Sequence, residues 1–163
     1  MDTIAVIKTL RYLLANNSDI RSYLGTSTVD AALLQIPYQD GIVAQRVNFQ
    51  SYPVIAMKID DDDEDVLRGS DSNTIFVTMV VINYINNNVG SFNWLEVLHR
   101  IKDKMKLLIK DNHETINSQG TALSLNLKIR DAHWVGGVTY DDKTQGTEDL
   151  HKIICTTKFI VGD

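Results

Sequence analysis

The sequence predicts an α+β fold in which a mainly antiparallel β-sheet carries an N-terminal helix and a central helix packed on one side. Apolar stripes at helical spacing within residues 2–14 and 94–110 predict the two helices. Runs rich in β-branched and aromatic residues at 53–59, 74–84 and 150–161 predict strands. Short connections between strands favour antiparallel order.

The first helix is predicted over residues 2–14, where Ile4, Ile7, Leu10 and Leu14 fall on one face. We interpret this face as core packing. A membrane or partner helix is the alternative, but the polar face lacks the lysines typical of helices that lie on membranes.

A short second helix is predicted over residues 19–24, with Ser18 as its N-cap and Gly25 as a left-handed stop. The next stretch carries weaker signals. Residues 31–34 and 42–44 each fit either a short strand or a helical turn.

Two firm strands follow, separated by an acidic run. Residues 53–59 are predicted to form an edge strand, because the leading Pro53 donates no hydrogen bond to a ladder. Residues 74–84 are apolar on both faces, which indicates a central strand covered on both sides. Between them, the like charges of residues 60–65 repel one another and predict a solvated loop.

The clearest helix of the chain is predicted over residues 94–110, with Ser91 or Asn93 as its cap. Residues 111–120 are polar, and we expect a flexible loop there. Leucine and isoleucine then alternate with polar residues over 123–129, a period of two that predicts a strand with one wet face.

The C-terminal part is predicted to add two more strands, which makes three after the central helix. Residues 134–140 form the first of these, with a bulge or a close approach at Gly136 and Gly137. Residues 150–161 form the last strand of the chain.

Length and composition limit the classes of function that the sequence is compatible with. The chain has 163 residues, so we expect a single domain over 1–163, and its one cysteine, Cys155, allows no internal disulfide. With 16 Lys and Arg against 21 Asp and Glu, the net charge of -5 argues against general affinity for nucleic acid phosphate. Lys8 and Arg11 interrupt the N-terminal apolar residues, and no run is long enough to span a membrane. We therefore expect a soluble protein made inside the cell.

Residue patterns for catalysis or metal binding are absent from the sequence. The acidic run lacks the alternating ligands and the glycine turn of a calcium loop. No nucleophile elbow, phosphate-binding loop or zinc-ligand spacing occurs, and mid-strand Cys155 fits a buried, inert thiol. We expect no enzyme activity, no metal and no cofactor. A small metal-dependent enzyme that uses the carboxylates of residues 60–65 is the distant alternative.

The order of these elements resembles that of the tail terminator, or tail completion, proteins of long-tailed bacteriophages. The resemblance rests on the amphipathic opening helix, the edge strand that begins Tyr52-Pro53-Val54-Ile55, the loop to a long strand, the 94–110 helix and the C-terminal strands that end Phe159-Ile160-Val161. It spans nearly the whole chain.

The resemblance implies an antiparallel sheet with helices on one side and a homo-oligomeric, hexameric ring at the head-proximal end of the tail tube in the virion. There the protein would end tube polymerisation, hold the tail tube protein and dock the neck or head connector. It would be made in the host cytoplasm, contact no membrane and have no catalytic residues. Another head–tail connector or neck protein of the same particle is the nearest alternative.

A ring subunit needs surfaces that pair with a neighbouring copy. The edge strand led by Pro53 and the C-terminal strand that holds Phe159 are candidates for sheet extension. Trp134, beside two glycines, is a candidate interface residue, with core packing as the alternative.

The acidic run is a candidate for the ring lumen or for contact between rings. Its carboxylates would repel passing DNA, so the DNA would travel through without specific binding. The residues concerned are Asp60, Asp61, Asp62 and Asp63.

Overall fold

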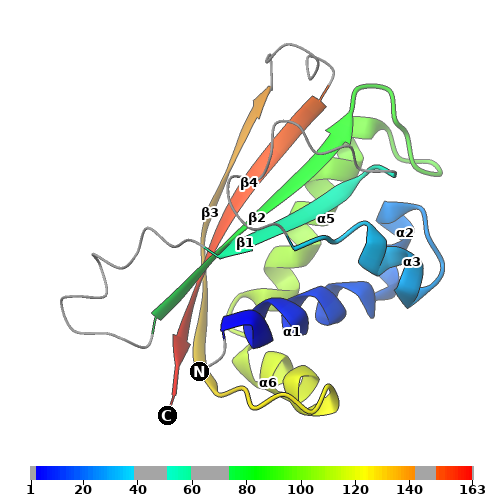
Figure 1. Cartoon of the computed structure of the whole chain (residues 1–163). Helices are drawn as coiled ribbons and strands as arrows, with labels where there is room; N and C mark the ends of the chain where they lie inside the picture. The colour runs from blue at the N-terminus through cyan, green and yellow to red at the C-terminus, as the bar shows by residue number, and fades with distance from the viewer. Residues whose placement is uncertain (1–2, 39–50, 60–73, 142–149, 163) are drawn as a thin grey trace.

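The computed structural model of the chain describes residues 3–38, 51–59, 74–141 and 150–162. It has two layers, an antiparallel four-stranded sheet and a group of helices gathered on one of its faces (Figure 1). The sheet order is β1-β2-β4-β3. The predicted α+β class is confirmed.

The N-terminal helices cover the β1 side of the sheet. α1 (Thr3–Ala15) confirms the first predicted helix and buries Ile7, Leu10 and Leu14. α2 (Ser18–Leu24) ends at Gly25 in the left-handed conformation, as predicted. Its N-cap is Asn17 and not Ser18, because the Asn17 side chain accepts hydrogen bonds from the backbone N–H groups of Asp19 and Ile20.

The ambiguous stretch after α2 is helical where the structure describes it. α3 (Val29–Leu34) has Thr28 as its N-cap, and the Thr28 hydroxyl accepts a hydrogen bond from the Ala31 N–H at 3.2 Å. Residues 42–44 lie outside the described residues.

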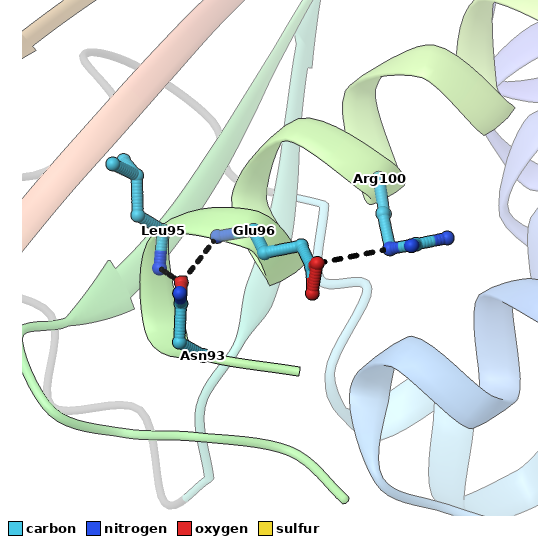
Figure 2. Close-up of polar contacts among 4 residues, drawn as sticks. All are labelled: Asn93, Leu95, Glu96 and Arg100. Atoms are coloured by element: carbon cyan, nitrogen blue, oxygen red, sulfur yellow. Dashed lines mark hydrogen bonds and ion pairs between the residues drawn. The ribbon is translucent and has the colours of Figure 1, made fainter. Parts of the chain in front are cut away.

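The central helix α5 (Trp94–Ile109) begins where the sequence predicts a cap. Figure 2 shows the Asn93 side chain accepting from the N–H groups of Leu95 at 3.1 Å and Glu96 at 2.8 Å. The Glu96 carboxylate in turn lies 3.7 Å from the Nε atom of Arg100, one helical turn further along α5. The apolar face of α5 packs onto β2, β3 and β4.

The sheet consists of four strands, two of them before α5 and two after it. β1 (Val54–Ile59) is an edge strand and β2 (Thr74–Tyr84) is an interior strand, as predicted. β3 (Ile129–Asp141) and β4 (Leu150–Val161) form the C-terminal pair. β3 contains the predicted strand 134–140 and extends it toward the N-terminus.

Both faces of β2 are buried, which explains its unbroken apolar run. Val77, Met79 and Val81 face the helices and join the main core, together with side chains of α1 and α5. Val80 and Ile82 point the other way and cluster with Leu150 of β4.

Two predictions between α5 and β3 are wrong. Residues 111–120 form no loop, because α6 (His113–Ala122) occupies most of them. This helix is polar because it buries only Ile116 and Gly120. A Cβ at Gly120 would lie 3.0 Å from the Cβ of Leu127, so the glycine permits close packing.

The stretch 123–128, predicted as a strand, pairs with no strand among the described residues. Its odd-numbered side chains are still less exposed than its even-numbered ones. The alternating hydrophobicity therefore predicts which side chains are buried, but the prediction that this segment pairs in the sheet is wrong for the described residues. After α5 the described chain forms two strands and a helix, and not three strands.

The fold predicts a large contrast between two residues of α5. Ile101 is 0% exposed in the main core, whereas Leu107 is 69% exposed on the same helix. Replacing Ile101 with alanine leaves a cavity and should lower the free energy of unfolding by about 3 kcal/mol in urea denaturation. Leu107→Ala is the matched control and should change it by less than about 0.5 kcal/mol. Equal losses in the two variants would contradict this packing.

Candidate subunit interface

The outer edge of β1 is already occupied by the chain itself. The Ile55 N–H donates a hydrogen bond to the Gln35 carbonyl at 2.8 Å, and the Met57 N–H donates to the Pro37 carbonyl at 3.0 Å. Tyr38 adds a parallel bridge to Met57. The strand predicted to extend the sheet therefore has the outward N–H groups of Ile55 and Met57 satisfied within the chain.

The segment that covers β1 is held in place by the buried side chain of Gln35 and the half-buried side chain of Arg11. The Gln35 side chain donates to the carbonyls of Leu24 at 2.9 Å and Pro53 at 3.0 Å. The Arg11 guanidinium donates to the carbonyls of Leu33 and Ile36, and its partial burial lowers its pKa. A second copy could pair with β1 only by breaking these bonds.

The first part of the β3 edge is also covered. The Asn117 side chain donates to the Ile129 carbonyl and accepts from the Ile129 N–H, both at 2.8 Å. The Asp111 N–H donates to the Ala132 carbonyl at 2.9 Å. α6 and the turn before it thus replace a neighbouring strand over this stretch.

Beyond Ala132, the outer side of β3 has no such cover from the described residues. β3 is the last strand of the sheet, and within the described ranges no strand pairs with its outer side. Its ladder with β4 shifts register between Trp134 and Gly136, which leaves Val135 without a partner in the register. Val135 is 60% exposed. This stretch, residues 134–141, is called the open edge below.

The candidate residues from the sequence fall in different places. Pro53 is buried directly before β1, which begins at Val54. Phe159 is 0% exposed in the main core, on a strand paired with β2 on one side and β3 on the other. Trp134 begins the open edge, where it is half-buried against the core. Asp60, Asp61, Asp62 and Asp63 lie outside the described residues.

The suggestion that the C-terminal strand extends the sheet is therefore wrong. Hydrophobicity marks β4 as a strand, but its position depends on which strands it pairs with, and it lies in the interior. Sequence reasoning also missed Gln35, Asn117 and Val135. The first two are polar residues whose role arises from contacts across the fold, and Val135 is one apolar residue in a predicted strand.

Charge is divided unevenly along the chain. The described residues hold 13 of the 16 Lys and Arg but only 8 of the 21 Asp and Glu. The acidic excess therefore falls in the ends of the chain and in residues 39–50, 60–73 and 142–149. The described part has a net positive formal charge.

Titratable side chains of the described part make local pairs. His133 Nε2 lies 2.9 Å from the Asp131 carboxylate, and the His151 ring lies against Trp94 with centroids 4.6 Å apart.

Among the described residues, no three His, Cys, Asp or Glu side chains come together in a group able to hold a metal ion. None of the described helices is long and apolar enough to cross a membrane.

The sequence matches none of the protein-family models against which it was compared. A search of curated proteins finds no relative.

The Asn117 bridge gives a test of the covered part of β3. Asn117→Ala removes both partners of the Ile129 backbone and should lower the free energy of unfolding by about 1–3 kcal/mol. Ser118→Ala, an exposed neighbour on α6, is the control and should stay within about 0.5 kcal/mol of the unchanged protein. Urea denaturation measures both, and an Asn117→Ala variant as stable as the control would contradict the bridge.

Cys155 gives a pH-dependent prediction. Burial raises the pKa of its thiol from 9.0 to about 12, against a smaller lowering by the charge of Lys102. Well below pH 9 the thiol keeps its proton in both states and contributes no pH dependence. Above that value the unfolded chain loses this proton while the folded chain retains it, so stability falls as pH rises.

The measurement compares urea denaturation at about pH 8 and about pH 10 in the unchanged protein and in Cys155→Ala. The variant should lose about 1 kcal/mol less stability over this interval, since its unfolded state has no thiol to ionise. An identical loss in the two proteins would show that Cys155 is not buried as described.

Proposed function

We propose that this protein is a structural subunit of a phage virion. It forms a homo-oligomeric ring, expected to be hexameric, at the head-proximal end of the tail tube. There it ends tube polymerisation and provides the docking surface for the neck or head connector. The observation that carries the proposal is the contrast between the β1 edge, which the chain itself covers, and residues 134–141 of β3, on whose outer side the described part of the chain places no strand.

The architecture supports this proposal. The tail terminator resemblance requires an antiparallel sheet with helices on one side, and the described residues form that arrangement (Figure 1). The long apolar strands and α5 build one continuous apolar core. A well-packed core suits a part that must hold its shape between two larger assemblies.

The distribution of charge supports a role around DNA. In a ring, the basic described part would face protein partners, and the acidic residues 60–65 would repel DNA in the lumen. Passage of DNA needs a wall that does not hold phosphate. The partners on this account are further copies of the chain, the tail tube protein and the connector protein.

The test adds the purified chain to tail tube protein of its phage during polymerisation. We expect shorter tubes that carry a ring at one end in negative-stain images, because a bound ring blocks addition of the next tube subunits. An unrelated acidic protein of similar size is the control and should leave tube length unchanged. Tubes that elongate normally and carry no ring would contradict the proposal. Binding to purified head connectors without binding to tubes would indicate a neck protein instead.

A further inference from the structure

We draw no further inference here: the strongest candidate, the surface patch where β2 ends and α5 begins, in which the apolar side chains of Tyr84, Ile85 and Leu95 are exposed, is an unpartnered apolar face, and nothing in the structure shows what covers it.

Discussion

An open β-sheet leaves a row of backbone donors and acceptors along each outer strand, and these groups must find partners in the chain, in water or in another molecule. The protein meets this constraint differently at its two edges. At β1, the carbonyls of Gln35 and Pro37 take the outward N–H groups, and Arg11 holds the covering segment in place. At β3, Asn117 and Asp111 cover only the first residues. The placement of the segment after α3, the placement of α6 and the candidate interface all follow from how the two edges are covered.

Elements whose residues face a core along their whole length could be predicted from the sequence. The α1 stripe, the α5 stripe with its Asn93 cap, and the apolar run of β2 all belong to this class. α6 could not be predicted, because a helix that buries only Ile116 and Gly120 leaves almost no periodic signal. Residues 123–128 show the opposite case, since alternating burial there is produced by packing on the helices and not by pairing in a sheet.

The candidate interface was harder to predict than the fold. Sequence patterns identify strands, but strand order decides which of them lie at an edge, and the order here places β4 and Phe159 in the interior. Whether an edge is covered depends on contacts between segments far apart in the chain, such as Asn117 with Ile129 and Gln35 with Ile55. The overall charge was also an incomplete guide, because the described part is basic although the whole chain carries a net charge of -5.

The central claim is that the chain covers the β1 edge and the start of β3, while no strand of the described ranges lies on the outer side of residues 134–141. Amide hydrogen exchange tests this claim most directly. The measurement uses the folded chain diluted until it is monomeric and follows the amides of both edges in one experiment. We expect Ile55, Met57 and Ile129 to exchange slowly, since their N–H groups are bonded within the chain, and the outward-facing amides of residues 134–141 to exchange fast. Slow exchange of every amide along 134–141 in the monomer, or fast exchange at Ile55 and Met57, would contradict the account.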